Sequence, residues 1–280
     1  MATVLSTSQV NRLGERLAKS DVPSADDLRE LAGFQELHIE PMSAVGAAVQ
    51  ATARAMQIEG QGFAGFQVTQ RLKTSNTLID KLRRGTRLTR MQDIGGVRLV
   101  AVMPLWRQDE CVARLTRALP ITDTVDRRRA PTHGYRAVHL VVNIDGRNIE
   151  VQIRTSIQQT WADVTEALAD IWGRQIRYGG APAGPDELTT AQRIRAFSIW
   201  VNAAGIWGEW ERVMSNTLFE LWHTPASDWS KLMRVRQRAI TIWHNRLVRA
   251  VAETGLPEVV NAVSEALNRN KPTNFTRTKP

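Results

Sequence analysis

The sequence is poor in the residues that build cross-linked or metal-stapled proteins. Only Cys111 is a cysteine, which excludes an internal disulfide framework and any cysteine-rich metal site. It falls in a helical pattern, DECVARLTRAL, where a small buried hydrophobe is expected. No apolar run is long enough to cross a membrane, and the N-terminal segment lacks the apolar core of a secretory signal. These absences predict a soluble, reduced, cytoplasmic protein without a membrane partner.

Several familiar catalytic signatures are also missing. The chain has no Gly-rich Walker loop, kinase signature, HExxH pair or nucleophile elbow. Positive charge, in contrast, is plentiful: 37 Lys and Arg stand against 28 Asp and Glu, for a net charge of +9. Such an excess is typical of proteins that bind phosphorylated small molecules, nucleic acid or an acidic surface. A basic soluble protein without such a partner fits the composition equally well.

The hydrophobic pattern changes period along the chain. Helices are expected within residues 6–57, followed by a Gly-rich bend, EGQGFAG, and a loop or strand end leading into a short basic helix closed by Gly85. VRLVAVM predicts a buried strand, and QDECVARLTRAL predicts a helix. VHLVVNI and NIEVQIRT predict a β-hairpin that turns at Asp145-Gly146. With the helical SIQQTWADVTEALADIWGR after it, this order indicates an α/β or α+β core with a mixed sheet.

The C-terminal part is expected to be helical again, from a Gly/Pro-rich connector to about residue 268. It holds six of the nine tryptophans, and Trp207 and Trp210 lie at the i, i+3 spacing of helix packing. A stacking platform for bases is the alternative, but aromatic residues at helical spacing favour packing. The tail, NRNKPTNFTRTKP, is expected to be disordered. Four regions are therefore predicted: 1–60 (helical), 61–180 (core), 186–268 (Trp-rich helical) and 269–280 (tail).

A first polar cluster lies in RLKTSNTLIDKLRRGTRLTR. On a helix Thr77 and Lys81 share a face, and Arg71 and Lys73 come just before it. Such a group suits the grip of a triphosphate through charge-assisted hydrogen bonds. A solvated basic face is the alternative, and it would be favoured if this segment stood alone.

A second group combines two carboxylates. Asp93 directly precedes the buried strand, and Glu150, Gln152 and Arg154 share one face of the second hairpin arm. If the two strands are neighbours, the carboxylates would meet among cations, an arrangement suited to metal-assisted phosphoryl transfer. The alternatives are a plain turn aspartate and a solvent-exposed strand. The apolar VHLVV arm argues against the exposed strand.

Five motifs together resemble the synthetase domain of the RelA/SpoT family, pyrophosphokinases that make the alarmones (p)ppGpp. They are RLKTSNTLIDKLRR, RMQDIGGVRLV, HGYRAVHLVV, IEVQIRT and QQTWADVTEAL, in the family's order and spacing from about residue 66 to 180. The resemblance implies an α+β, nucleotidyltransferase-like fold, with a mixed sheet flanked by helices and helical extensions. It also implies Mg²⁺ as cofactor and ATP as pyrophosphate donor.

The resemblance implies a role for each matching position. Asp93 and Glu150 would be catalytic and hold Mg²⁺, and Glu150 would also activate the acceptor 3′-hydroxyl. The ATP-binding residues would be Arg71, Lys73, Thr77, Lys81 and Arg98, with Arg71 and Arg98 on either side of the adenine. The acceptor-binding residues would be Tyr135, His139, Gln152 and Arg154, with Tyr135 stacking on the base. The remaining cations form a predicted basic patch: Arg83, Arg84, Arg87, Arg90, Arg127, Arg128 and Arg129.

The sequence departs from the family pattern at three places. Thr77 stands where the family usually has Ser, and Glu166 stands where many members carry His. RRRAPTHGY replaces the commoner Lys/Pro-Asn/Ser-Gly-Tyr form, so the departures bear mainly on the acceptor. No His-Asp dipeptide of the family's hydrolase domain occurs, and a small, single-domain synthetase is expected.

Three functions are therefore considered. The first is transfer of the β,γ-pyrophosphate of ATP to the 3′-hydroxyl of GDP or GTP. The second is a toxin that pyrophosphorylates the 3′ CCA end of tRNA, with an antitoxin protein as partner. The third is a catalytically silent nucleic-acid-binding protein, which has no use for two carboxylates that would repel its ligand. A homo-oligomer is a further expectation, with the Trp-rich helices as the place for such contacts.

Overall fold

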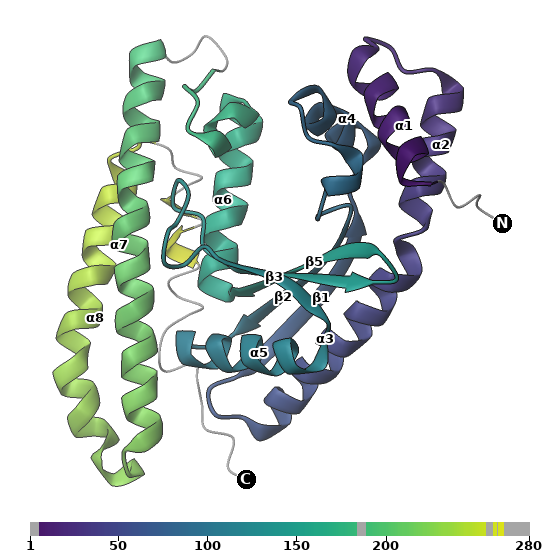
Figure 1. Cartoon of the computed structure of the whole chain (residues 1–280). Coiled ribbons are helices and arrows are strands. Elements are labelled where there is room, and N and C mark those ends of the chain that lie inside the picture. The colour runs from purple at the N-terminus through teal and green to yellow at the C-terminus, as the bar shows by residue number, and fades with distance from the viewer. Residues whose placement is uncertain (1–5, 184–188, 256–259, 262, 266–280) are drawn as a thin grey trace.

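The computed structural model of the chain describes residues 6–183, 189–255, 260–261 and 263–265. Figure 1 shows the course of the chain. The strands are β1 (Ala64–Leu72), β2 (Gly95–Val102), β3 (Ile121–Asp126), β4 (Val138–Ile144) and β5 (Arg147–Thr155). The α-helices are α1 (Thr7–Lys19), α2 (Ala25–Glu36), α3 (Ile39–Glu59), α4 (Ser75–Arg83), α5 (Leu105–Ala118), α6 (Ser156–Trp172), α7 (Thr190–His223) and α8 (Trp229–Ala252). Short 3₁₀ helices occupy Leu88–Arg90, Arg174–Tyr178 and Ala226–Asp228.

The strands form one mixed sheet in the order β1-β2-β5-β4-β3. β2 and β5 run parallel, and the other neighbouring pairs run antiparallel. A parallel pair requires a long crossover, which α5, β3 and β4 supply between the two strands. The α+β fold predicted from the sequence, a mixed sheet flanked by helices, is confirmed.

The predicted hairpin is present as β4 and β5. Asp145 and Gly146 form its turn with φ of 48° and 75°, the two positive values that a type I′ turn requires. The register pairs Ile144 with Arg147 next to the turn. The turn fixes this register, and the register decides which side chains of the two strands share a face.

The two edge strands were not recognised in the sequence. β1 lies where a bend and a loop or strand end were expected, and β3 lies in what was described only as a basic stretch. β3 is mostly polar, whereas β1 alternates exposed polar residues with the partly buried Phe66 and Val68. Their strand structure depends on pairing with β2 and β4, and polar side chains on an edge also discourage pairing with other chains.

One face of the sheet is covered by α3 and α5, which lie together on the same side in both figures. This core takes alternate side chains from three central strands and packs them against apolar residues of the two helices. Its strand members are Val97, Leu99, Ala101, Val138, Leu140, Val142, Ile149, Val151 and Ile153. Cys111 of α5 is buried in it, and burial raises the pKa of its thiol to about 12. The cysteine is the inert, buried hydrophobe that the sequence indicated.

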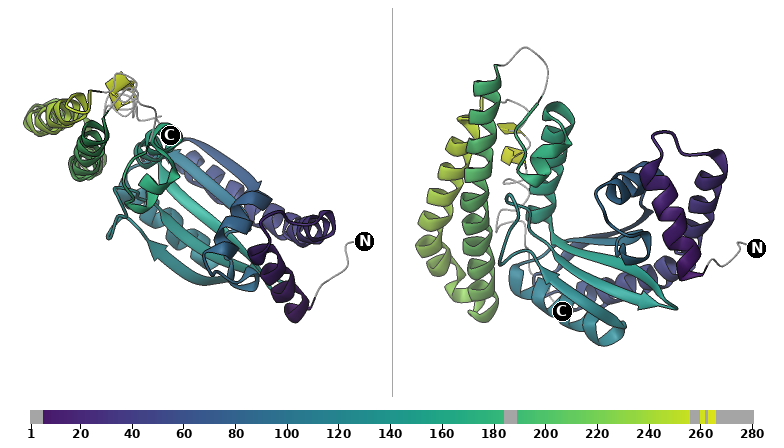
Figure 2. Two further views of the ribbon diagram at one scale, coloured as in Figure 1. Left: turned by 90° about the horizontal axis from the view of Figure 1, so that it is seen from above. Right: turned by 45° about the horizontal axis from the view of Figure 1, so that its top comes forward.

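Two further hydrophobic clusters border the opposite face. One joins α1, α2 and α4, and the other joins α6, α7 and α8. Figures 1 and 2 show these groups on opposite sides of the uncovered face of the sheet. The polar side chains of β1, β2, β4 and β5 that point away from α3 and α5 therefore lie between the two groups.

Tryptophan packing holds α7 on α6. The rings of Trp161 and Trp200 stack at a centroid distance of 3.8 Å and an interplanar angle of 4°. Trp200, Trp207 and Trp210 are all buried. Packing is confirmed for these residues, which are not available to stack on bases.

The boundaries of the four predicted regions stay predictions, and the described helices and strands fall within three of these regions. Residues 1–60 hold α1–α3, residues 61–180 hold the sheet with α4–α6, and residues 186–268 hold α7 and α8. The predicted tail, 269–280, lies outside the described residues. None of the helices in the described part of the chain combines the length and the apolar character needed to cross a membrane.

Candidate active site

The candidate site is the uncovered face of β2, β5 and β4. The parallel register sets Arg98 beside Gln152, and the antiparallel register sets Gln152 beside His139. Glu150 lies two residues before Gln152 and therefore on the same face. The polar residues of β5 can share this face because Ile149, Val151 and Ile153 alternate into the core on the other side.

At one end of this face Asp93 is held by two lysines. Asp93 directly precedes β2, Lys73 directly follows β1, and Lys81 lies on α4. Both ammonium groups donate to the same carboxylate oxygen, Oδ2; the Lys81 Nζ–Oδ2 distance is 2.6 Å. The backbone N–H of Lys73 also donates to the carbonyl of Ile94 at 2.8 Å, which fixes the lysine beside β2.

The charge state of Asp93 follows from these contacts. Burial alone would raise the pKa of the carboxyl, but the hydrogen bonds from Lys73 and Lys81 outweigh it and hold the pKa below its usual value. Burial lowers the pKa of Lys73, against the opposing influence of Asp93. The other carboxylate oxygen, Oδ1, is buried and has no hydrogen-bond partner among the described residues. An ionised carboxylate with an unpaired buried oxygen is ready to bind a further cation.

In the middle of the face Glu150 belongs to a closed ring of hydrogen bonds. His139 Nδ1 lies 2.7 Å from Glu150 Oε1, and His139 Nε2 lies 2.9 Å from the hydroxyl of Tyr135. Arg154 donates to that hydroxyl at 2.7 Å and to Gln152 Oε1 at 2.9 Å. Gln152 Nε2 completes the ring by donating to Glu150 Oε2 at 2.7 Å.

The direction of each hydrogen bond in the ring follows from two of its members. The Arg154 guanidinium can only donate, and an ionised Glu150 can only accept. Tyr135 therefore donates its O–H to His139 Nε2, and His139 in its neutral form donates Nδ1–H to Glu150. Burial would raise the pKa of Glu150, but these donors, His139 first, lower it below its usual value. Glu150 is thus an ionised carboxylate that accepts hydrogen bonds from both His139 and Gln152.

Three cavities meet around Arg71. The smallest, about 210 Å³, is lined by both carboxylates, Asp93 and Glu150, together with Lys73 and Arg98. A second, about 280 Å³, lies between Tyr135 and α6. A third, about 700 Å³, extends along α4 and α6. Arg71 lines all three, so the cavities form one connected region of the surface.

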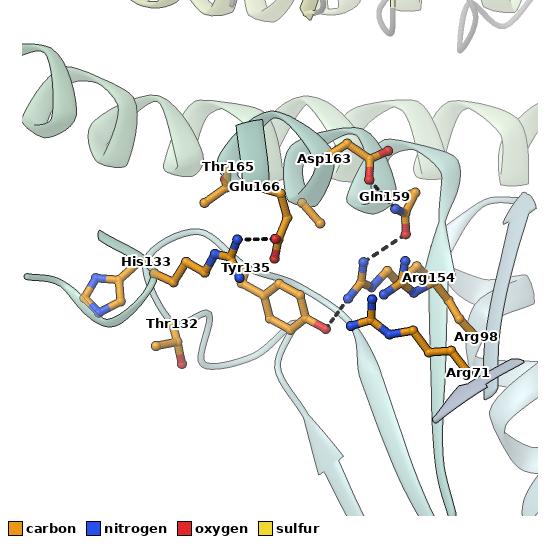
Figure 3. Close-up of a pocket in the computed structure, with 12 residues that line it drawn as sticks. Arg71, Arg98, Thr132, His133, Tyr135, Arg154, Gln159, Asp163, Thr165 and Glu166 are labelled. Atoms are coloured by element: carbon orange, nitrogen blue, oxygen red, sulfur yellow. Dashed lines mark hydrogen bonds and ion pairs between the residues drawn. The ribbon is translucent and has the colours of Figure 1, made fainter. Parts of the chain in front are cut away.

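The 280 Å³ cavity is strongly cationic on one side. Figure 3 shows the guanidinium groups of Arg71, Arg98 and Arg154 gathered beside the hydroxyl of Tyr135. Arg154 also lies over the Tyr135 ring, with Cζ 4.9 Å from the centroid. Burial, together with repulsion from Arg154 and Arg71, lowers the pKa of Arg98. Three cations held this close favour an anionic ligand that would relieve their repulsion.

The structure brings together most of the residues selected from the sequence. Asp93, Glu150 and Gln152 line the smallest cavity, Thr77 lines the largest, and Lys81 reaches the site through its bond to Asp93. His139 is placed by its bonds to Tyr135 and Glu150. Their roles in binding and catalysis stay predictions, but their proximity is a finding.

The predicted basic patch does not form one surface. Arg83 and Arg84 line the largest cavity, whereas Arg87 and Arg90 are exposed beside the 3₁₀ helix and line none of the three cavities. Arg127 and Arg129 are exposed beyond the end of β3. Arg128 instead turns inward, where it forms ion pairs with Asp126 and Asp109. Arg129 also lies 3.7 Å from Asp126 but stays exposed, whereas both carboxylates hold Arg128 inward.

A polar stripe of α6 was missed. Gln159, Asp163 and Glu166 line the 280 Å³ cavity, and Glu166 and Asp170 line the largest one. Their spacing of four, three and four residues puts them on one face of the helix, a signal that was readable in the sequence. Glu166 forms an ion pair with Arg177. Many proteins of the RelA/SpoT pattern carry His at this position.

The donor set fits a magnesium ion shared with a phosphorylated ligand. Mg²⁺ is commonly bound by one or two protein carboxylates, with phosphate oxygens and water as the remaining ligands. Asp93 and Glu150 line one cavity, and the buried, unpaired Oδ1 of Asp93 supplies a ligand atom. No cluster of three or more His, Cys, Asp or Glu that could hold a metal alone occurs among the described residues.

A comparison with known protein families finds a match over the part of the chain that forms this site. Residues 70–169 match the family model described as "Region found in RelA / SpoT proteins". Uncharacterised proteins of Mycobacterium tuberculosis and Mycobacterium bovis are 38% identical over 132 residues, which is 45% of this chain and 48% of theirs. The chain thus aligns with about half the length of these curated relatives.

Solved structures of Bacillus subtilis proteins are similar at lower identity. Small alarmone synthetase 1 is 20% identical, with a TM-score of 0.48 over 68% of this chain and 98% of the other. The same enzyme bound to AMPCPP is 18% identical, with a TM-score of 0.43 over 67% and 94%. Small alarmone synthetase 2 is 22% identical, with a TM-score of 0.37 over 59% and 93%. At TM-scores below 0.5 these likenesses carry no weight for the activity of this chain.

Proposed function

The core of this chain is a RelA/SpoT region, residues 70–169, and on that premise we propose that the protein is an ATP-dependent pyrophosphotransferase. One observation carries the proposal: Asp93 and Glu150 line the same cavity with Lys73 and Arg98. Two ionised carboxylates among cations repel a simple anion but suit a metal-bound triphosphate next to a hydroxyl. The proposed product is a nucleotide with a pyrophosphate on its 3′-oxygen, of the (p)ppGpp type.

ATP is proposed to enter through the largest cavity. Its lining includes Lys73, Thr77 and Arg71. Lys81 is hydrogen-bonded to Asp93. The lysines that bond Asp93 would also bond phosphate oxygens, which accept charge-assisted hydrogen bonds more strongly than neutral groups do. The planar guanidinium groups of Arg71 and Arg98 are suited to stack on the adenine.

Asp93 and Glu150 would hold Mg²⁺, which, when bound, neutralises developing charge on the transferred phosphates. The protein's own groups position the two reactants. The acceptor 3′-oxygen attacks the β-phosphorus, the bond from that phosphorus to the oxygen bridging the α-phosphate breaks, and AMP leaves with this oxygen. The hydroxyl proton passes to Glu150, whose oxygens already face the donors of His139 and Gln152.

The acceptor is proposed to occupy the 280 Å³ cavity, with its base against Tyr135 and its phosphates near Arg154. GDP or GTP is the leading acceptor, because a cavity of this size with several guanidinium groups suits a nucleotide with a diphosphate. The 3′ CCA end of tRNA is the second candidate. It is favoured by the exposed Arg127 and Arg129, close in sequence to Thr132 and His133 of the cavity.

A transfer assay separates the candidates. The protein is incubated with Mg²⁺ and ATP labelled on its β-phosphate, together with GDP, GTP or deacylated tRNA, and the label and AMP are followed. Label only in guanosine nucleotides supports the leading function, and label only in tRNA supports the second. If no label reaches either acceptor, whether or not AMP is released, the result contradicts both proposed functions. It then favours a silent nucleic-acid-binding protein.

A variant of Glu150 tests the site within this assay. Glu150→Gln is expected to lower transfer by about 100-fold or more, the usual contribution of a positioned base. Binding of a non-hydrolysable ATP analogue should change little by comparison. Asp163→Asn, which alters an exposed carboxylate of the acceptor cavity, is the matched control and should retain most of the transfer. Undiminished turnover in Glu150→Gln contradicts the proposed role.

A further inference from the structure

The helix α8 carries positive charge and no negative charge. Its 24 residues, Trp229–Ala252, contain no Asp or Glu. They contain one lysine and five arginines: Lys231, Arg234, Arg236, Arg238, Arg246 and Arg249. Over the whole chain Asp and Glu offset about three quarters of the basic residues, so α8 differs from the rest of the protein.

Four of these cations form one exposed row, which we name the α8 stripe. Its members are Lys231, Arg234, Arg238 and Arg249. Their spacing of three, four and eleven residues returns to the same side of a helix, and each is exposed. At about 1.5 Å per residue the stripe extends over roughly 27 Å.

The α8 stripe is not neutralised within the described part of the chain. None of its four side chains forms an ion pair there, whereas Arg236, on another side of the helix, bonds Glu220 of α7. Glu209 pairs with Arg212, and the two acids at the ends of α8, Asp228 and Glu253, form no ion pair with the stripe among the described residues. A row of unpaired cations raises the local positive potential and attracts a polyanion.

The apolar side of α8 is already used. Ile240, Leu247 and Val251 are buried in the cluster shared with α6 and α7. Figures 1 and 2 place α7 between α8 and the sheet, so the opposite side of α8 faces outward. An amphipathic helix binds a membrane by inserting its apolar face, and here that face packs on α7. The geometry therefore favours a hydrated polyanion over a lipid surface.

A cavity continues the basic surface toward the candidate active site. Arg246, next to the stripe on α8, lines a space of about 550 Å³ together with Arg136 and Arg212. Arg136 is bonded to the carbonyls of Gly134 and Ala204 and has no carboxylate partner among the described residues. It lies next to Tyr135 in the chain, which lines the acceptor cavity. Glu209 and Glu211 also line this cavity, so it joins α8 to the loop that borders the acceptor cavity through side chains of both charges.

We propose that the α8 stripe binds the phosphate backbone of a nucleic acid. A single strand or a duplex edge presents regularly spaced phosphates, and a rigid row of cations on one helix face meets several of them at once. Base recognition is not required, because long, exposed Lys and Arg side chains contact phosphates without reading sequence. The inference does not depend on the pyrophosphotransferase activity and holds for a nucleic acid that is either acceptor or regulator.

Fluorescence anisotropy tests the proposal with the full chain. The probes are a labelled single-stranded RNA, a DNA strand of the same sequence, and deacylated tRNA, each titrated over a range of KCl concentrations. The stripe variant replaces Lys231, Arg234, Arg238 and Arg249 by Gln. The control variant makes the same charge change elsewhere, replacing Arg12, Lys19, Arg54 and Arg117, which are also exposed and outside the site.

The stripe variant should bind about 10-fold or more weakly near 0.1 M salt, and the slope of log K against log[salt] should fall in magnitude by about 3 to 4, as expected for loss of four phosphate contacts. The control should stay within about twofold of the wild type, because its charges lie away from the contact. Weakening for RNA alone identifies RNA as the ligand, and equal weakening for both strands identifies the shared backbone; both support the proposal. Equal weakening of the stripe and control variants overturns it, as does tighter stripe-dependent binding to phosphatidylserine vesicles.

Activity separates this inference from the proposed function. The stripe variant should release AMP with GDP as acceptor at the wild-type rate, since none of its positions lines the three cavities of the site. A wild-type protein that binds RNA through the stripe but transfers nothing removes the proposed function and leaves this inference in place. A protein that transfers pyrophosphate to GDP but binds no nucleic acid overturns this inference and leaves the proposed function in place.

Discussion

His139 and Glu150 lie on neighbouring antiparallel strands, with His139 Nδ1 2.7 Å from Glu150 Oε1. The register pairs His139 with Gln152 and Val141 with Glu150, so the contact crosses the ladder diagonally. Because the other nitrogen of His139 is occupied by the Tyr135 hydroxyl, the imidazole has a fixed orientation. A titratable carboxylate is thus joined to a side chain that stabilises its ionised form.

Loss of this contact should move the acidic limb of the activity profile. His139 lowers the pKa of Glu150, so His139→Ala should raise that pKa, and ionised Glu150 would then be lost at a higher pH. The loss of the AMP-forming rate relative to the wild type should therefore be larger at acidic pH than at pH 8. The control is Tyr135→Phe, which retains the His139–Glu150 bond and should keep the position of the limb. Identical shifts in both variants would argue against the contact.

Asp93→Asn should uncouple nucleotide binding from magnesium. The variant loses the ionised carboxylate and its unpaired Oδ1, while Lys73 and Lys81 remain. Calorimetry with a non-hydrolysable ATP analogue should show tighter binding with Mg²⁺ than with EDTA for the wild type and a difference of less than about twofold for Asp93→Asn. Transfer should fall by about 100-fold or more. Asp80→Asn, an exposed carboxylate in the largest cavity, is the control and should keep the magnesium effect.

Glu211 should make stability fall as pH rises. Burial raises the pKa of this carboxyl despite a hydrogen bond from Thr155, so the folded protein holds the proton after the unfolded chain has released it. The penalty is absent below the ordinary pKa of 4.5 and grows as pH increases above it. Glu211→Gln should therefore be more stable than the wild type at pH 7, on the order of 1 kcal/mol.

Urea denaturation between pH 4 and pH 8 checks this difference. The two stability curves should converge near pH 4 and separate toward neutral pH. Glu209→Gln, a partly exposed carboxylate paired with Arg212, should change stability by less than about 0.5 kcal/mol with no such separation. Parallel curves for Glu211→Gln and the wild type would show that the buried carboxyl does not titrate as described.

Gly134 should not tolerate a side chain. Its φ is +85°, and an added Cβ would lie 2.4 Å from Cβ of Ala204 and 2.8 Å from the Trp161 ring. Gly134→Ala should destabilise the fold by about 2 to 4 kcal/mol, from backbone strain and overpacking together. In Gly146→Ala the φ is +75° but no atom lies within 4 Å, so only the strain of about 1 kcal/mol is expected. Equal losses of unfolding free energy in the two variants would exclude the packing contribution.

Much of the core could be predicted from local patterns. The Asp145-Gly146 turn carries its own backbone signal, and the alternation of Ile149, Val151 and Ile153 with polar residues separates a buried face from an open one. The nearness of Asp93 to Glu150 needed one further fact, the parallel pairing of β2 with β5, which was assumed as a condition. The hydrophobic alternation and the turn residues therefore predicted the hairpin strands. The order of the strands in the sheet could be learned only from the structure.

What the sequence did not reveal depends on distant partners. β1 and β3 are edge strands that pair with β2 and β4. The side chains of β3 are too polar to indicate a strand, whereas the alternation of Phe66 and Val68 with polar residues in β1 was readable. Arg128 resembles its neighbours in the sequence, but ion pairs with Asp109 of α5 and with Asp126 hold its side chain inward. The contribution of α6 could have been found, since Gln159, Asp163, Glu166 and Asp170 already follow a helical period.

The end of β5 has a mechanical consequence. Thr155 is both the last residue of β5 and the N-cap of α6, and its hydroxyl donates to Glu211 of α7 at 2.5 Å. A force that displaces α7 and α8 therefore pulls directly on the strand whose preceding residues include Arg154 and Glu150. Thr155 therefore couples the hairpin of α7 and α8 to the strand that carries Glu150, through one side-chain hydrogen bond.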